Sequence, residues 1–167
     1  YDNNWEQPAR HTMALMWNKR IKIVAGADTN KENLERWKKF VKDAETFESS
    51  DRLYESFTPH NIPDIIVLAV NEDSHLEPAL LAISKKPRLI ILEKPVALNS
   101  LEGKKILSQS KKYGVPILVN HERRFSKDYK IARDYINQIG DIQKINANLF
   151  SGMRLYDPKK ESNGGYS

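Results

Sequence analysis

The sequence predicts an α/β protein with a doubly wound parallel sheet, and two observations support this fold class. Apolar runs at 63–70, 89–92 and 115–120 have no polar alternation, which is typical of strands buried on both faces of a parallel sheet. Amphipathic helical segments separate these runs with short connections, the order expected of βαβ units. The sequence therefore favours a sheet with helices packed on it.

The first half of the chain begins with the end of a helix, because "PARHTMALMWN" is followed by strand-like "IKIVAGAD" (21–28). Thr29 and Glu32 have the spacing of a capping box and predict the start of the next helix. A short strand at Thr46–Phe47 and a brief helix from 51 to 57 are expected to follow.

The second half repeats strand and helix. Ser74 with Glu77, and Asn99 with Glu102, predict two helix starts, and Gly114 predicts the end of the second helix. After the strand at 115–120, a helix ending at Gly140 and a strand within 141–152 are expected. We interpret these last two elements as the start of a second domain.

The usual strand order of such a sheet, 3-2-1-4-5-6, places its first strand between the strands ending at Asp28 and Val70. Nothing before the first helix resembles that strand, and no G-x-G-x-x-G is present. We therefore expect residues 1–122 to form an incomplete dinucleotide-binding domain and 123–167 to begin a second domain. Both ends look cut, which leaves room for a signal peptide before Tyr1.

Composition limits the function classes. The 167 residues contain no cysteine, so disulfides and thiolate sites are excluded, as is usual for a cytoplasmic protein. No apolar run reaches membrane-spanning length. The net charge of +5 comes mainly from lysine pairs on separate predicted helices, without interleaved aromatic residues. We expect no nucleic-acid partner, no membrane partner and no metal.

Polar residues follow each predicted strand at the sheet edge where α/β folds bind ligands. Asp28 suits the hydroxyl groups of an adenosine ribose, although Asp also caps helices. Asn71 follows the strand at 63–70, and His75 lies in the next helix turn, where it is either a ligand contact or a structural residue.

Two further groups of charged residues follow apolar strands. Glu93, Lys94 and Pro95 end the central run, either as a surface loop or as part of a site. The segment "NHERRF" brings Asn120, Arg123 and Arg124 to the end of the next strand. The arginines suit anions and carboxylates, or belong to a solvated linker.

"ADTN", "LAVNEDSH", "ILEKPVALN" and "VNHERRF" resemble, in order and spacing, the Gfo/Idh/MocA oxidoreductases. The resemblance implies an N-terminal NAD(P)-binding Rossmann domain and an α/β substrate and oligomerisation domain that begins with residues 123–167. It also implies a homo-oligomeric enzyme that oxidises a sugar, a polyol or a related secondary alcohol. A dinucleotide-binding regulator without catalysis is the alternative. The glycine loop and the downstream D-x-x-x-H motif of relatives, which supplies their usual catalytic His, are absent from this sequence.

The resemblance assigns roles residue by residue. It places Asp28, Asn71, His75, Glu93 and Asn120 on the cofactor, and Arg123 and Arg124 at the substrate. Lys94 would contact both and act as the catalytic residue. Asp28 would repel the 2′-phosphate of NADP, so NAD is the expected cofactor. We also predict a cis Lys94–Pro95 bond.

Overall fold

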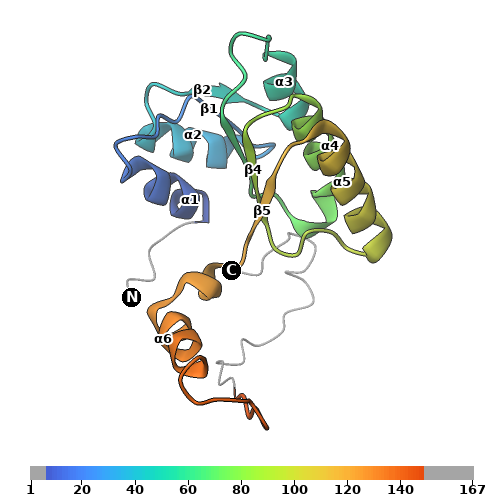
Figure 1. Ribbon diagram of the computed structural model, residues 1–167. Coiled ribbons are helices and arrows are strands. Elements are labelled where there is room, and N and C mark those ends of the chain that lie inside the picture. Colours follow the sequence, from blue (N-terminus) through green and yellow to red (C-terminus); the bar gives the residue numbers. More distant parts are fainter. Residues whose placement is uncertain (1–6, 149–167) are drawn as a thin grey trace, which may run out of the picture.

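The computed structural model describes residues 7–148, and Figure 1 shows the arrangement of its elements. Its helices are α1 (Gln7–Met16), α2 (Lys31–Phe40), α3 (Ser50–Glu55), α4 (Leu76–Ser84), α5 (Ser100–Tyr113) and α6 (Lys127–Ile136). Its strands are β1 (Ala25–Ala27), β2 (Glu45–Phe47), β3 (Ile65–Leu68), β4 (Leu89–Glu93) and β5 (Ile117–Asn120). Short 3₁₀ helices, Glu72–Ser74 and Glu122–Phe125, follow β3 and β5.

All strand pairs among the described residues are parallel, which confirms the predicted fold class. The strands form two sheets, β1-β2 and β3-β4-β5. Strand β1 does not pair with β3, in agreement with the prediction that another strand belongs between them. The free edge of β1 and the free edge of β3, between which that strand would lie, therefore have no strand partner within residues 7–148.

One face of the β3–β5 sheet is covered by helices α4 and α5 (Figure 1). We call it the covered face, and its central residues are Ile66, Leu68, Ile90 and Leu92. They are 6% exposed or less and pack with Ile83 of α4 and Ile106 of α5. Burial of each such side chain stabilises the fold by roughly 1.5–3 kcal/mol.

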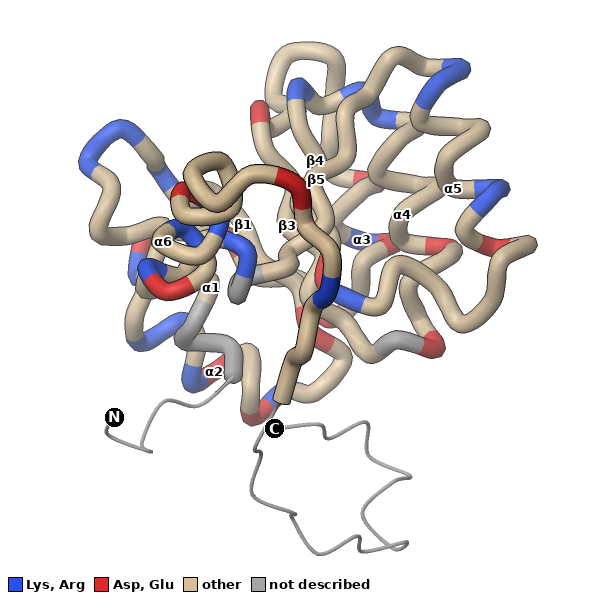
Figure 2. Tube along the Cα trace, turned by 60° about the horizontal axis from the view of Figure 1, so that its bottom comes forward, with Lys and Arg blue, Asp and Glu red and all other residues tan. Residues whose placement is uncertain are grey.

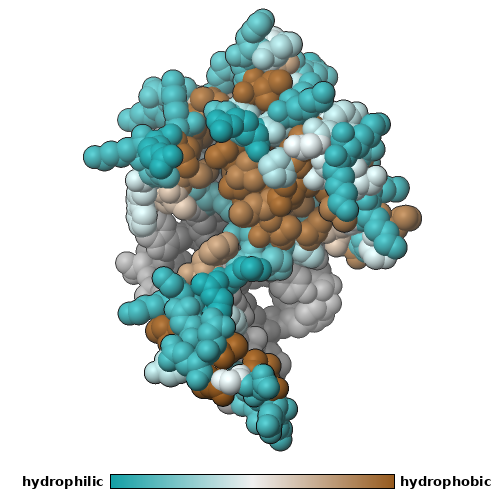
Figure 3. All heavy atoms as spheres, viewed as in Figure 1, coloured by the Kyte–Doolittle hydropathy of each residue, from teal (hydrophilic) through white to brown (hydrophobic). Residues whose placement is uncertain are grey.

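Successive side chains of a strand point to opposite faces of the sheet, so the residues between those of the covered face point to the other side, which we call the open face. It contains Ile65, Ile91, Glu93, Leu118 and Asn120, of which Ile65 is 37% and Leu118 41% exposed. Figure 3 shows apolar side chains at the surface near the strands of this sheet. Among the described residues, no helix covers the open face as α4 and α5 cover the other.

The β1–β2 sheet is organised around Trp37 of α2. A Cβ atom at Gly26 would lie 2.6 Å from the Trp37 ring, so only glycine allows this close approach. The Trp37 indole donates a hydrogen bond of 2.7 Å to Thr12 Oγ1, which ties α2 to α1. Helix α3 contacts β1, β2 and α4, and so connects the two sheets.

Two predicted helix starts were wrong. Asn30, not Thr29, caps α2, because its side chain accepts hydrogen bonds from the backbones of Glu32 and Asn33. Ser74 does not cap α4, since Ser74 closes a preceding 3₁₀ turn and its hydroxyl donates to Asp73. The tertiary path of the β3–α4 connection thus moves the helix start to Leu76.

The ends of α5 are as predicted. Asn99 accepts a hydrogen bond from the Glu102 backbone at 3.0 Å, and its amide donates to the Glu102 carboxylate at 2.9 Å. Gly114 ends the helix with φ 68°, a left-handed conformation that glycine adopts without a Cβ clash. This local signal needs no tertiary contact.

The expected strand within 141–152 is not observed in its described part, because residues 141–148 have no regular secondary structure. A strand requires a neighbour for its backbone groups, and no described strand lies beside this segment. Residues 149–152 lie outside the described range. The preceding helix also ends at Ile136, before Gly140.

Candidate functional site

The candidate site lies at the carboxyl ends of β4 and β5, on the open face. Glu93 is the last residue of β4 and Asn120 the last of β5, and the two are direct partners in the parallel register. Paired residues point to the same side of a sheet, so their side chains can meet. The Asn120 Nδ2 donates to Glu93 Oε1 at 2.6 Å.

Glu93 has a second partner from a distant part of the chain. His11 Nε2 of α1 lies 2.7 Å from the same Oε1 atom. The remaining oxygen, Oε2, accepts from the Lys94 backbone N–H at 3.2 Å. Burial acts to raise the Glu93 pKa, but the hydrogen bonds from Asn120 and His11 and the positive charge at His11 outweigh it. The pKa of this carboxyl is therefore held below its ordinary value.

Lys94 and Pro95 turn the chain away from the end of β4. The Lys94–Pro95 peptide bond is cis, as predicted. Lys94 is exposed, and no described residue forms an ion pair or hydrogen bond with its ammonium group. The side chain is thus available to a ligand at this edge, and its catalytic role stays a prediction.

Asp28 follows β1 directly and lies two residues before Asn30, the N-cap of α2. Its Oδ1 accepts from the Asn30 backbone at 2.8 Å, so the carboxylate supports the turn into α2. Its backbone donates to Phe47 O at 3.2 Å, which fixes it at the carboxyl end of the β1–β2 sheet. Contact of Asp28 with a ribose is untested by this geometry.

Asn71 and His75 follow β3 and differ in accessibility. Asn71 is exposed at the carboxyl end of the strand. His75 is only 1% exposed, and its Nε2 lies 3.0 Å from Val70 O. Within the described residues, His75 Nδ1 has no hydrogen-bond partner. Its contact with cofactor stays a prediction, and here the ring supports the end of β3.

The two arginines of the predicted substrate site lie in the 3₁₀ helix after β5. Arg124 is exposed, and its backbone N–H donates to His121 O at 2.9 Å. The side chain of Arg123 is outside the described part of the structure. Their contact with substrate stays a prediction.

His11 belongs to the candidate site but was not predicted from the sequence. The signal was indirect: a carboxylate that ends an apolar strand needs donors, and "PARHTM" offers a histidine on a neighbouring helix. Its contact with Glu93 spans 82 residues of sequence, so only the fold reveals it.

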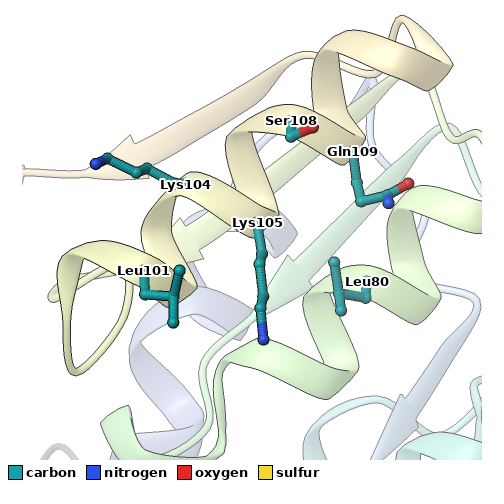
Figure 4. A pocket seen from close by; sticks show the side chains of 6 residues that line it. All are labelled: Leu80, Leu101, Lys104, Lys105, Ser108 and Gln109. Carbon is teal, nitrogen blue, oxygen red and sulfur yellow. The ribbon is translucent and has the colours of Figure 1, made fainter.

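Other features of the described residues do not compete with this site. Lys and Arg are spread over separate helices and loops (Figure 2). No group of three or more His, Asp or Glu residues there could hold a metal, and no helix there is long and apolar enough to cross a membrane. A hollow of about 310 Å³ lies between α4 and α5 and is lined by Leu80, Leu101, Lys104, Lys105, Ser108 and Gln109 (Figure 4).

Comparison with known protein families gives a match over residues 5–121 to an oxidoreductase family with an NAD-binding Rossmann fold, GFO_IDH_MocA. The chain belongs to the Gfo/Idh/MocA oxidoreductase family. The predicted family is therefore confirmed, and with it the NAD-binding Rossmann fold of that family. A search of curated proteins gave no match.

Solved structures share the fold at low sequence identity. The WlbA dehydrogenase from Bordetella pertussis, in complex with NADH and UDP-GlcNAcA, is 23% identical with a TM-score of 0.69 over 77% of this chain. The scyllo-inositol dehydrogenase from Lactobacillus casei is 18% identical with a TM-score of 0.66 over 76%.

The biliverdin reductase from Synechocystis, in complex with biliverdin and NADP+, is 20% identical with a TM-score of 0.66 over 79% of this chain. The matched region spans 38%, 36% and 40% of these three proteins, respectively. The first was solved with NADH, the second in its apo form and the third with NADP+, so the fold is shared by proteins that bind different nicotinamide cofactors.

Proposed function

We propose that this chain is the cofactor-binding part of a dehydrogenase that transfers a hydride between NAD and a secondary alcohol of a sugar, polyol or related substrate. The observation that supports it most is the Glu93–Asn120 pair at the ends of adjacent parallel strands. This is the sheet edge at which open α/β folds bind ligands.

The residues at this edge suit a dinucleotide. Glu93 keeps an oxygen, Oε2, whose only described contact is the Lys94 backbone, and a carboxylate oxygen can accept a further bond from a ribose hydroxyl. Asp28, Asn71 and Asn120 add acceptors and donors for ribose and amide groups. When bound, the nicotinamide supplies the hydride chemistry.

Lys94 is the residue we assign to proton movement. Its exposed amino group at the end of β4, in the neutral form, can accept the proton of the substrate hydroxyl as hydride leaves the carbon, and as ammonium it can return that proton in the reverse direction. Arg123 and Arg124 follow β5 and would orient polar groups of the substrate. His75 would keep the chain after β3 in place beside the cofactor through its contact with Val70 O.

Asp28 supports NAD over NADP. A carboxylate at the end of β1 disfavours a 2′-phosphate there, because like charges repel. Lys31, whose ammonium forms an exposed 3.0 Å ion pair with Glu48, can partly offset this repulsion. NAD specificity of roughly tenfold to a hundredfold is therefore expected, about 1.4–2.8 kcal/mol.

The chain spans less than two thirds of the relatives compared above, so substrate and assembly belong to the whole protein. We propose a homo-oligomer located in the cytoplasm, the compartment that the lack of cysteine favours. The substrate is a small molecule, and neither nucleic acid nor a membrane is proposed as a partner.

Turnover of a panel of sugars and polyols by the whole protein, with NAD and with NADP, tests this function. We expect NADH formation, detected by absorbance, with at least one secondary alcohol. Tight NAD binding without turnover of any substrate, together with unchanged binding in Lys94→Ala, would instead identify a dinucleotide-binding regulator.

A further inference from the structure

We propose that His11 of α1 is a positioning residue that holds the Glu93 carboxylate in one orientation, so that Oε2 faces the ligand. The inference deepens the proposed function, because it depends on Glu93 as a cofactor contact. It concerns a residue of the β1–β2 half of the molecule acting on the β3–β5 half.

The first step concerns the different hydrogen bonds of the two Glu93 carboxylate oxygens. Oε1 receives Asn120 Nδ2 at 2.6 Å and His11 Nε2 at 2.7 Å, which accounts for both of its lone-pair directions. Within residues 7–148, Oε2 receives a hydrogen bond only from the Lys94 backbone N–H, at 3.2 Å. Rotation of the carboxylate would break two short bonds at once, so Oε2 is the oxygen left for a hydroxyl group.

The second step fixes the direction of the His11 bond. An ionised carboxylate can only accept hydrogen bonds, and the lowered pKa of Glu93 keeps it ionised near neutral pH. His11 must therefore donate through Nε2–H. Asn120 reaches Glu93 from a paired strand, whereas His11 reaches it from a helix, so the two donors fix the carboxylate from different elements.

The third step is the support of His11 itself. The next residue, Thr12, is 6% exposed and accepts the 2.7 Å bond from Trp37. Trp37 in turn packs on Gly26 of β1. Helix α1 is thus fixed to the β1–β2 half, and the His11–Glu93 contact, with side chains 30% and 24% exposed, joins it to β4 at a partly accessible edge.

The test compares His11→Ala and His11→Gln in the whole protein, with His60→Ala as the matched control. Glutamine can place an amide donor where His11 Nε2 lies. His60 is an exposed loop histidine, outside the candidate site. Two quantities are measured: the NADH dissociation constant by fluorescence, and the Glu93 titration by carboxyl ¹³C NMR, assigned with Glu93→Gln.

We expect His11→Ala to weaken NADH binding about tenfold, or about 1.4 kcal/mol, and to raise the Glu93 pKa. His11→Gln should recover binding to within about threefold, while His60→Ala should match the wild type. A merely structural role would lower the melting temperature of both His11 variants without moving the Glu93 titration, and this result would overturn the inference.

NADH binding by His11→Gln that is as weak as binding by His11→Ala would also overturn the inference, because a hydrogen-bond donor at this position would then make no difference. If the wild type does not bind NADH, the proposed function fails. The carboxyl titration still decides in that case whether His11 holds Glu93, so the two failures are distinguishable.

Discussion

The two faces of the β3–β5 sheet come from the same strands and yet differ in chemistry. On the covered face, Leu92 is completely buried under α4 and α5. On the open face, its neighbour Glu93 keeps a partly exposed carboxylate with donors from two other elements. The buried core and the candidate site are thus separated by one residue, because successive side chains of a strand point to opposite faces.

The largest expected effect is on catalysis at the end of β4. Lys94→Ala in the whole protein should reduce kcat by roughly 10²–10⁴ while the melting temperature stays unchanged, since Lys94 is exposed. Lys94→Arg should not restore activity, because guanidinium differs in geometry and stays charged. Steady-state kinetics with thermal unfolding decide this, and normal turnover by Lys94→Ala would remove Lys94 from the site.

Leu92→Ala tests the covered face. Truncation of this fully buried side chain should lower the free energy of unfolding by about 2–5 kcal/mol. The matched change on the open face, Leu118→Ala, should have a much smaller effect because Leu118 is 41% exposed. Denaturant titration measures both, and equal losses would contradict the distinction between the faces.

Asp28 extends the comparison to the other sheet. Asp28→Ser should reduce the preference for NAD over NADP by roughly tenfold, with the larger change in KM for NADP, because the repelling carboxylate is removed. The ratio of kcat/KM for the two cofactors measures this. A wild-type enzyme that uses both cofactors equally would show that Asp28 does not select between them.

The smallest effect expected is on the pH dependence of stability. Because the folded-state pKa of Glu93 lies below its ordinary value of 4.5, its ionised form stabilises the fold above that pH. This contribution is lost as the pH falls through the lower, folded-state pKa. The difference in melting temperature between wild type and Glu93→Gln should therefore shrink below pH 4.5. A constant difference down to the acid limit would argue against an ionised Glu93 in the fold.

Local signals determined much of this protein from sequence alone. Uniformly apolar runs predicted the parallel strands β3, β4 and β5, and Asn99, Glu102 and Gly114 set the ends of α5, because such caps form within one helix turn. The positions of Glu93 and Asn120 at strand ends were also readable, since residues after buried strands meet at one sheet edge.

Tertiary structure alone decided the rest. The His11–Glu93 contact joins positions 82 residues apart, the start of α4 depends on the path of the chain after β3, and His75 is buried through packing. The strand expected within 141–152 is another example, since its described residues, 141–148, form no strand. Alternation predicts a strand only where a neighbouring strand can take its backbone hydrogen bonds, and sequence spacing does not contain that information.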